Sequence, residues 1–310
     1  MSDSNSKITP ETFKFRHRLE FTLFNSLKRW GKGASKKTRR RGAILLDGLL
    51  YHGLRICRRI VAINLELAFP KFSTVERKQI ARANYRWFAR FCMDVLHMDA
   101  WKGHTSEIAK CHNLEILDQA LSEKKGVLLI SGHFGNWEMI PPALAELGYS
   151  VTMYVGRQTN LLTNELQNTA RANFGVETID KGKRATLQMG RALAANKIIA
   201  MLIDQNDNKS DLFVNFFEKL ASSSKGTAAF HLLRKSPVVL VTCPYVGDHL
   251  EISFQRITFD LSGEQEKDTL AITQKITSAF ENVIRKYPEQ YFWMHRRWRA
   301  RPQEDPEDIY

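Results

Sequence analysis

The sequence predicts an α/β fold, a mixed sheet flanked by helices, preceded by an N-terminal helical segment. The N-terminal third carries apolar residues at helical spacing. From Asn113 onward, short apolar runs alternate with helical segments, which is typical of a sheet covered by helices on both faces. With 310 residues, 43% of them hydrophobic, the chain is long enough for a sizeable core. We expect a helical segment at 1–112, an α/β domain at 113–302 and a flexible tail at 303–310.

The first predicted helix is amphipathic. Thr9 and Pro10 form a helix-start signal, and a basic run at 36–41 follows the helix. Such a helix beside a polybasic stretch can lie in the headgroup layer of an anionic membrane. The alternative is a helix that packs its apolar stripe into the core. The stripe consists of Phe15, Leu19, Leu23, Leu27 and Trp30.

The next segments are helical but are not expected to span a membrane. Ser73 and Glu76 form a capping box for a helix from Thr74 to about Met98. A spanning helix needs about 20 mostly apolar residues in a row. The best candidate, 43–68, is interrupted by charges, and residues 1–10 lack the apolar core of a secretory signal. The interrupting charges are Asp47, Arg55, Arg58 and Arg59.

The α/β region contains six predicted strands and five predicted helices. Functional residues in such folds sit in loops beyond the carboxyl ends of strands. The predicted strands cover 127–130, 151–155, 176–179, 198–203, 238–243 and 250–254, and the predicted helices cover 114–122, 161–173, 184–195, 226–234 and 271–287.

Charge and cysteine content limit the classes of partner. The net charge of +13 implies anionic partners, such as acidic lipids, phosphorylated substrates or an acidic carrier protein. A nucleic-acid partner is not predicted, because no recognisable motif accompanies the charge. The four cysteines are scattered without zinc or redox spacing, and we expect no metal or cofactor. The segment 293–301 interleaves tryptophan with arginine, which suits a membrane interface or anionic sugar phosphates.

One run carries the chemistry. In "GVLLISGHFGNWE", residues 126–138, an apolar strand ends at Ser131, and His133 follows in a glycine-containing turn. We expect Asn136 to cap the next helix and Glu138 to lie in its first turn. A carboxylate bonded to one ring nitrogen fixes the imidazole tautomer and makes the other nitrogen a better base. We therefore predict His133 as general base and Glu138 as its orienting carboxylate, with a substrate hydroxyl attacking directly.

Several motifs resemble those of one enzyme family. His133 and Glu138 match the HX4(D/E) signature of glycerolipid-type acyltransferases. The fuller run looks like the lipid A late acyltransferases, the lauroyl and myristoyl transferases of Gram-negative bacteria. Further similar segments cover roughly Arg58 to Pro302. They are "RRIVAINLELAFPKFSTVER", "LIDQN", "FVNFF" and "PEQYFWMHRRWRARP".

The resemblance implies the substrates. The donor is expected to be a thioester of acyl carrier protein, and the acceptor a hydroxyl of an anionic lipid A precursor, with no covalent acyl-enzyme. The expected location is the cytoplasmic face of the bacterial inner membrane, peripheral or weakly anchored. Arg157 falls where the family places a basic residue beside the transfer site. Asp204 and Gln205 end another predicted strand, so with Asn136 they are candidate substrate-binding residues. A buried role that organises the loop is the alternative for Asp204 and Gln205.

Other readings stay open. The same His–Glu pair can activate water, so an acyl thioesterase is an alternative, although no GxSxG or HExxH pattern is present. The acceptor can also be another glycolipid or a phospholipid. Two departures from the family pattern leave membrane attachment and substrate specificity open. The N-terminal region lacks the family's usual transmembrane helix, and the family's FFG reads Phe216-Phe217-Glu218 here.

Overall fold

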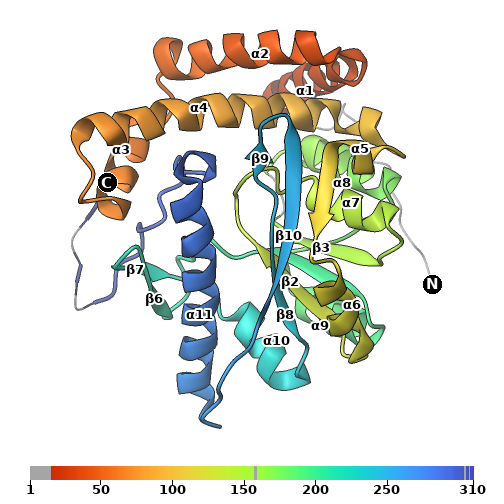
Figure 1. Ribbon diagram of the computed structural model, residues 1–310, viewed down its shortest axis with the longest axis vertical. Coiled ribbons are helices and arrows are strands. Elements are labelled where there is room, and N and C mark those ends of the chain that lie inside the picture. Colours follow the sequence, from red (N-terminus) through yellow and green to blue (C-terminus); the bar gives the residue numbers. More distant parts are fainter. Residues whose placement is uncertain (1–14, 157–158, 304, 307) are drawn as a thin grey trace.

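The computed structural model describes residues 15–156, 159–303, 305–306 and 308–310. Eight strands form one sheet, in the order β1-β10-β8-β2-β5-β3-β4 with β9 beside β10, and β6 and β7 form a separate hairpin (Figure 1). The strands of the large sheet are β1 (Ala109–His112), β2 (Val127–Ser131), β3 (Val151–Val155), β4 (Glu177–Asp180), β5 (Ile198–Leu202), β8 (Val238–Thr242), β9 (Tyr245–Val246) and β10 (His249–Ile257). The hairpin strands are β6 (Phe213–Phe216) and β7 (Lys219–Ser222).

Five neighbouring strands, β8, β2, β5, β3 and β4, are parallel, with β5 in the middle of them. β2 pairs with β5 on one side and with β8 on the other, while β10 runs antiparallel to β8. The chain leaves β2 toward β3 and β4, returns in β5, and reaches β8 only later. Loops at the carboxyl ends of β2 and β5 therefore meet beside this crossing point, where ligands bind in open α/β sheets.

Helices cover both faces and one end of the sheet. In Figure 1, α4 lies across one end of the sheet, with α1 and α2 beyond it. The longer helices are α1 (Phe15–Gly33), α2 (Lys36–Gly48), α3 (Arg58–Ala68), α4 (Thr74–His97), α6 (Glu115–Ser122), α8 (Leu161–Asn173), α9 (Ala185–Ala194), α10 (Gly226–Arg234) and α11 (Gln265–Lys286). The shorter ones are α5 (Thr105–Ile108), α7 (Ile140–Glu146), η2 (Leu49–Gly53), η3 (Met98–Trp101) and η4 (Pro288–Gln290).

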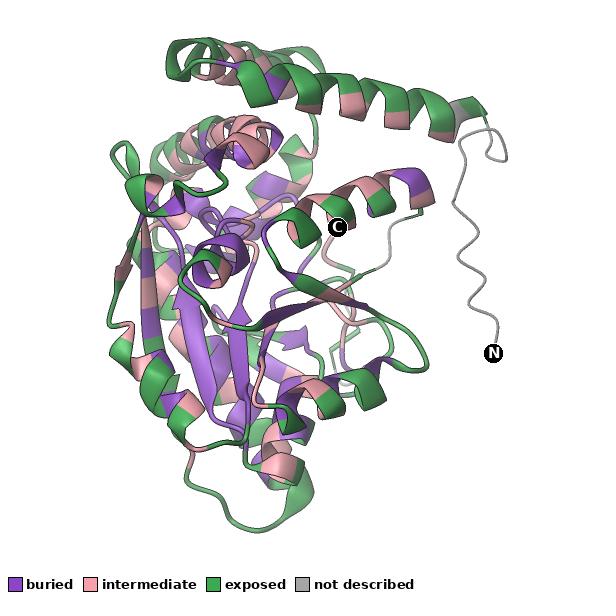
Figure 2. Cartoon of the chain, turned by 90° about the vertical axis from the view of Figure 1, so that its right-hand side faces the viewer, coloured by how far each residue is buried: buried purple, intermediate pink, exposed green. Residues whose placement is uncertain are grey.

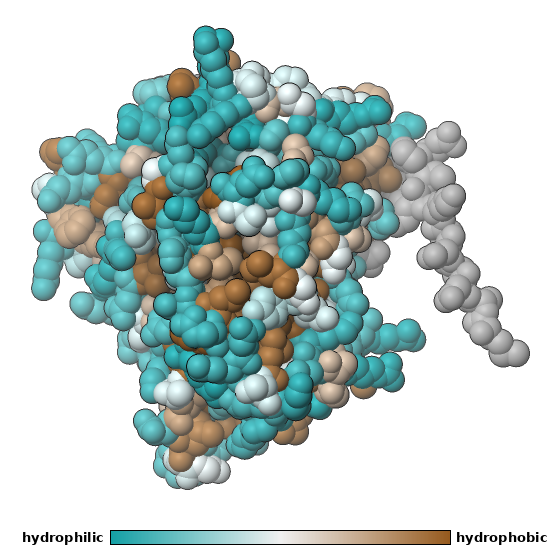
Figure 3. Space-filling view, turned by 45° about the vertical axis from the view of Figure 1, so that its right-hand side comes forward, coloured by the Kyte–Doolittle hydropathy of each residue, from teal (hydrophilic) through white to brown (hydrophobic). Residues whose placement is uncertain are grey.

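The core has two parts, one on each face of the sheet. Successive residues of β2 alternate between them, because neighbouring side chains of a strand point to opposite faces. Leu128 and Ile130 belong to one cluster, and Val127 and Leu129 to the other. Figure 2 shows the buried residues concentrated on the strands and the inner helix faces, and Figure 3 shows apolar side chains gathered near the middle of a mostly hydrophilic face.

The predicted fold class is confirmed, and so are several elements. The bounds predicted for β3, α8 and α10 agree with the structure, and the capping box of Ser73 and Glu76 is formed. The helix start predicted at Thr9 lies outside the described residues. The sheet begins earlier than expected, because β1 lies within 1–112. At the other end, Tyr310 packs against the core, and its hydroxyl donates to Asn64 Oδ1 at 2.6 Å.

Two findings concern the membrane expectations. Within the described ranges, no helix is both long and apolar enough to cross a membrane. The prediction that 293–301 forms an aromatic–arginine surface is wrong, because Trp293 and Trp298 are fully buried and Arg297 is only 2% exposed. The indole rings fill the core beside Phe216 and Phe217 instead. The sequence pattern of alternating tryptophan and arginine did not distinguish a buried tryptophan from one at a membrane interface.

Candidate active site

The loop after β2 is held so tightly that two of its positions require glycine. Ser131 ends the strand, and Gly132 lies against α11, where an added Cβ would come within 2.2 Å of the Phe280 ring. Gly135 has a φ of +60°, and a Cβ there would lie 2.0 Å from the Cys243 carbonyl oxygen. The loop is fixed further by the amide of Asn136, which donates to the same carbonyl at 2.7 Å. This packing sets the position of His133.

A Gly135→Ala variant is expected to lose more than about 2 kcal/mol of stability. A non-glycine residue in the left-handed conformation costs about 1–2 kcal/mol by itself. Here the backbone at Cys243, just after β8, must also move to make room for the added Cβ. Thermal or chemical unfolding measures the change. Gly175→Ala is the matched control, since its φ is +79° but the added Cβ meets nothing within 4 Å. Equal losses in both variants would contradict the proposed close packing.

The carboxylate bonded to His133 is Asp204. Asp204 Oδ1 accepts from His133 Nδ1 at 2.9 Å, and Oδ2 accepts from the His133 amide at 3.0 Å. Asp204 follows β5, the neighbour of β2, and its side chain is only 4% exposed. With Nδ1 donating to the carboxylate, Nε2 is the free base nitrogen. Nε2 lies 3.3 Å from the Gln205 amide nitrogen, which can donate to it.

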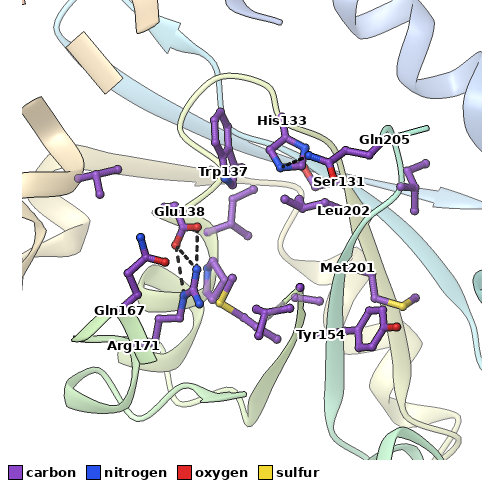
Figure 4. A pocket seen from close by; sticks show the side chains of 18 of the residues that line it. Ser131, His133, Trp137, Glu138, Tyr154, Gln167, Arg171, Met201, Leu202 and Gln205 are labelled. Carbon is purple, nitrogen blue, oxygen red and sulfur yellow. Dashed lines mark hydrogen bonds and ion pairs between the residues drawn. The ribbon is translucent and has the colours of Figure 1, made fainter. Parts of the chain in front are cut away.

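Glu138 has a different partner from the one expected. Its carboxylate forms a bidentate pair with Arg171 of α8, with Nη2–Oε1 at 2.9 Å and Nε–Oε2 at 3.4 Å (Figure 4). Helix α7 begins only at Ile140, so Glu138 precedes the helix instead of lying in its first turn. Pro141 and Pro142 occupy the first turn, where missing amide protons are tolerated. The orienting hydrogen bond predicted for Glu138 is thus made by Asp204.

The charges around His133 keep its imidazole basic. Burial lowers its pKa, but the charge and hydrogen bond of Asp204, with a further contribution from Glu138, hold the pKa above its ordinary value. The pKa of Asp204 is lowered: burial opposes its ionisation, but His133 outweighs burial. The pair is therefore an ionised carboxylate beside a basic imidazole, the arrangement that general-base catalysis requires.

A cavity of about 640 Å³ opens beside this pair. His133, Glu138, Arg171 and Gln205 line it together (Figure 4), and deeper along the strands its walls become apolar. A volume in this range and a few convergent polar groups are typical of small-molecule sites. Its apolar walls come from Leu129, Met153, Ala200 and Val241 of the sheet, with Phe91 and Ile140 from the helices.

The other predicted site residues lie in different places. Gln205 lines the cavity, as a substrate-binding residue should, whereas Asp204 is buried behind His133. Asn136 does not cap α7 as expected, because the N-cap of that helix is Met139. Asn136 is fully buried instead, and its side-chain amide donates to the Tyr245 hydroxyl at 3.1 Å, so it holds the loop in place. Arg157 lies outside the described residues. Among the residues described, no group of three or more metal-ligating side chains comes together.

Comparison with known proteins identifies the family. The model of the bacterial lipid A biosynthesis acyltransferases matches residues 46–300. The chain belongs to this family. It is 27% identical to a lipid A biosynthesis palmitoleoyltransferase of Escherichia coli (strain K12), over 77% of this chain and 78% of the relative. It is 26% identical to that organism's lauroyltransferase, over 84% and 85%, and 23% identical to a phosphatidylinositol mannoside acyltransferase of Mycolicibacterium smegmatis, over 71% and 73%.

In this acyltransferase, the C-terminal segment is hydrogen-bonded to the loops that carry the candidate site residues. The Phe292 amide donates to the His133 carbonyl at 2.9 Å, and His295 Nε2 accepts from the Asn206 amide at 3.0 Å. Burial lowers the pKa of His295 to about 4, so it stays neutral as an acceptor. Arg297 donates to Ser223 Oγ at 2.8 Å. The segment therefore supports the loops of the candidate site, and His295 serves there as a structural hydrogen-bond acceptor.

Sequence reasoning missed Arg171, and for Asp204 it missed the role as partner of His133. Arg171 lies 33 residues after Glu138, in a helix where its basic side chain looks like an ordinary surface residue. The link between His133 and Asp204 spans 71 residues, and it exists only because β2 and β5 are neighbours. The signal available was the position of both residues at the carboxyl ends of predicted strands.

Proposed function

We propose that this acyltransferase moves a fatty acyl chain from an acyl carrier protein thioester to a hydroxyl of a lipid A precursor. The observation that carries the proposal is the His133–Asp204 pair at one end of a cavity with apolar walls. The base suits a hydroxyl acceptor, and the cavity suits an acyl chain. The family relationship supports the class of both substrates.

The reaction follows from the positions of the ring nitrogens. Asp204 holds Nδ1–H, and Nε2 of His133 takes the proton of the acceptor hydroxyl. The oxygen then attacks the thioester carbonyl carbon to form a tetrahedral intermediate. The intermediate collapses with cleavage of the C–S bond, and the leaving thiolate takes the proton from the imidazolium. No acyl-enzyme forms, since the substrate itself supplies the nucleophile.

The Glu138–Arg171 pair serves the acceptor in this proposal. Arg171 lines the cavity, as do Lys181 after β4 and Lys28 of α1, the last paired with Asp99 at 3.1 Å. Arg171 and Lys181 are thus cations beside the space where a phosphorylated lipid would lie. A carboxylate that forms a bidentate pair with a guanidinium holds the guanidinium N–H donors in one orientation. Glu138 thus positions Arg171 for an anionic group, and its negative charge also raises the basicity of His133.

The test is an acyl-transfer assay on the purified protein. Acyl carrier proteins loaded with acyl chains of different lengths are incubated with a lipid A precursor, and products are measured by mass spectrometry. We expect an acylated lipid A precursor to form faster than free fatty acid. Equal release of fatty acid with and without acceptor indicates an acyl thioesterase. Transfer only to a phospholipid or to another glycolipid keeps the mechanism but replaces the acceptor.

A Glu138→Gln variant separates the two roles of that carboxylate. We expect KM for the acceptor to rise about tenfold, the equivalent of one charge-assisted hydrogen bond of about 1.5 kcal/mol. The acid limb of the rate profile should also move to lower pH. Neutral His133 is the active form, its pKa is raised partly by Glu138, and removing that charge lets the imidazole lose its proton at lower pH. An unchanged KM and an unchanged acid limb contradict both roles.

We also propose that α1 and α2 bind an anionic membrane, on the cytoplasmic face of the bacterial inner membrane. The apolar stripe of α1 faces outward: Phe15 is 74% exposed and Leu23 is 60% exposed. Helix α2 exposes Ile44 and Leu45, and basic side chains lie on the same helices. Exposed apolar residues beside cations are typical of an interfacial helix. The opposite side of α1 reaches the cavity with Phe24 and Lys28, so a lipid acceptor has a short path.

Vesicle binding tests this surface. Leu19 and Leu23 are both replaced with serine. Partitioning into vesicles of mixed zwitterionic and anionic lipid should fall at least about tenfold, because two leucines that become buried in the lipid contribute several kcal/mol to binding. Added salt should weaken binding of the unaltered protein. Leu187→Ser is the matched control, since Leu187 is 56% exposed on α9. Equal loss in the control contradicts a role for α1 specifically.

A further inference from the structure

The hydroxyl of Ser131 is buried and lacks a hydrogen-bond partner among the described residues. Ser131 is the last residue of β2 and is only 4% exposed. Its main chain is paired, because its carbonyl accepts from the Ile203 amide at 3.0 Å. Only the side-chain oxygen is left over. Buried hydroxyls almost always find a partner, because an unpaired one is destabilising.

The residue that carries this buried hydroxyl lines the cavity of the candidate site. Ser131 and Leu129 both line the cavity, as expected for alternate residues of one strand. Figure 4 draws Ser131 at the same end of the cavity as His133 and Gln205. Along β2 the order is therefore the base at the open end, then the hydroxyl, then the apolar wall. A thioester carbonyl placed beside His133 has Ser131 as its next neighbour.

Gln205 supplies a second donor near the same point. With Nδ1 of His133 bonded to Asp204, Gln205 Nε2–H donates to His133 Nε2 across 3.3 Å. When the acceptor hydroxyl takes its place at Nε2, this amide proton is released. Two neutral donors then face the position of the reacting carbonyl oxygen. Donors already in place when negative charge develops are the most effective form of electrostatic catalysis.

We propose that Ser131 Oγ–H, together with the Gln205 amide, forms the oxyanion site of this enzyme. The inference rests on the proposed acyl transfer. As the acceptor oxygen bonds to the thioester carbon, the carbonyl π electrons move to oxygen, and the two donors hold that oxyanion. When the carbonyl re-forms and the C–S bond breaks, the charge leaves with the thiolate, which the His133 imidazolium protonates.

Ser131 acts as a donor in this proposal and not as a nucleophile. An activated serine needs its oxygen hydrogen-bonded to the base nitrogen. Here the partner of His133 Nε2 is Gln205. The unpaired Ser131 Oγ–H has no bond to break before it donates to an oxyanion, whereas the Gln205 amide becomes free only when the acceptor hydroxyl replaces it at His133 Nε2.

The test compares Ser131→Ala with Ser131→Thr in the acyl-transfer assay. For Ser131→Ala we expect kcat to fall about 100-fold, the effect of removing one oxyanion donor, with KM changed less than about twofold. The acid limb of the pH profile should stay in place, because His133 keeps its neighbours. Ser131→Thr restores the hydroxyl and should recover most of the rate. A kcat of Ser131→Ala within twofold of the unaltered enzyme overturns the proposal.

Stability gives a readout that a structural role would not produce. Removing an unpaired hydroxyl should leave the melting temperature of Ser131→Ala equal or higher while the rate falls, whereas loss of a structural hydrogen bond would lower it. Intact-mass measurement after rapid quenching should show no acyl adduct; an adduct that Ser131→Ala abolishes makes Ser131 a nucleophile and overturns the proposal. If the unaltered enzyme transfers no acyl group, the proposed function itself fails, and this inference fails with it.

Discussion

Replacing His133 with alanine is expected to lower kcat about 10⁴-fold. The imidazole is the group that takes the acceptor proton in the proposed mechanism, and general-base catalysis contributes up to this factor. Binding of both substrates should persist, because the cavity walls and Arg171 are unchanged. The acyl-transfer assay measures kcat, and isothermal titration with acyl carrier protein measures binding.

The variant should still fold, because the His133 amide continues to donate to Asp204. Loss of the second hydrogen bond leaves a buried carboxylate less satisfied, so circular dichroism and melting must accompany the assay. His133→Asn is the companion variant, since its amide can still donate to Asp204. His104→Ala, at an exposed position, controls for the loss of a histidine. Full activity in folded His133→Ala would exclude His133 as the base.

The second large effect is expected from Asp204→Asn. An amide in this position no longer enforces the Nδ1–H tautomer and no longer steadies the imidazolium, so kcat should fall about 10²- to 10⁴-fold. The pKa of His133 should fall as well, because Asp204 contributes more than Glu138 to raising it. The residual activity therefore has its acid limb at lower pH than in the unaltered enzyme.

Comparison with Glu138→Gln decides which carboxylate orients the base. We expect Asp204→Asn to lower kcat by at least ten times more than Glu138→Gln, because of these two carboxylates Asp204 is the one hydrogen-bonded to the imidazole. Asp211→Asn is the control, since Asp211 is exposed and pairs with Lys225. If Glu138→Gln instead has the larger effect on kcat, the pairing changes when substrate binds, and the interpretation from the sequence is the better one.

Much of the fold was predictable because its signals are local. The apolar runs of β2, β3, β5 and β8 are buried on both faces and read as strands, and the capping box of Ser73 marks a helix start. The elements that escaped prediction are short or lack a period. Strand β1 has four residues, and the β6–β7 hairpin turns through Phe217 and Glu218, both at positive φ, where glycine or asparagine is the usual signal.

The candidate site was predictable only in part, for the same reason. His133 and Gln205 were selected because they follow strands, and both line the cavity. The spacing of His133 and Glu138 suggested a direct contact, but two side chains five residues apart in an irregular loop need not meet. Only the neighbouring β5 brings a carboxylate to Nδ1. Trp298 shows the same limit, since a tryptophan beside arginines has the same sequence pattern in a core as at an interface.

By itself the sequence determined the α/β class, the family resemblance and the identity of the candidate base. These predictions rest on the spacing of apolar residues and on one short motif, the run at 126–138. The tertiary structure decided the partners: Asp204 for His133 and Arg171 for Glu138, while the buried hydroxyl of Ser131 is left unpaired. These contacts join segments 33 to 71 residues apart. Strand order and helix packing set such distances, and no local pattern encodes them.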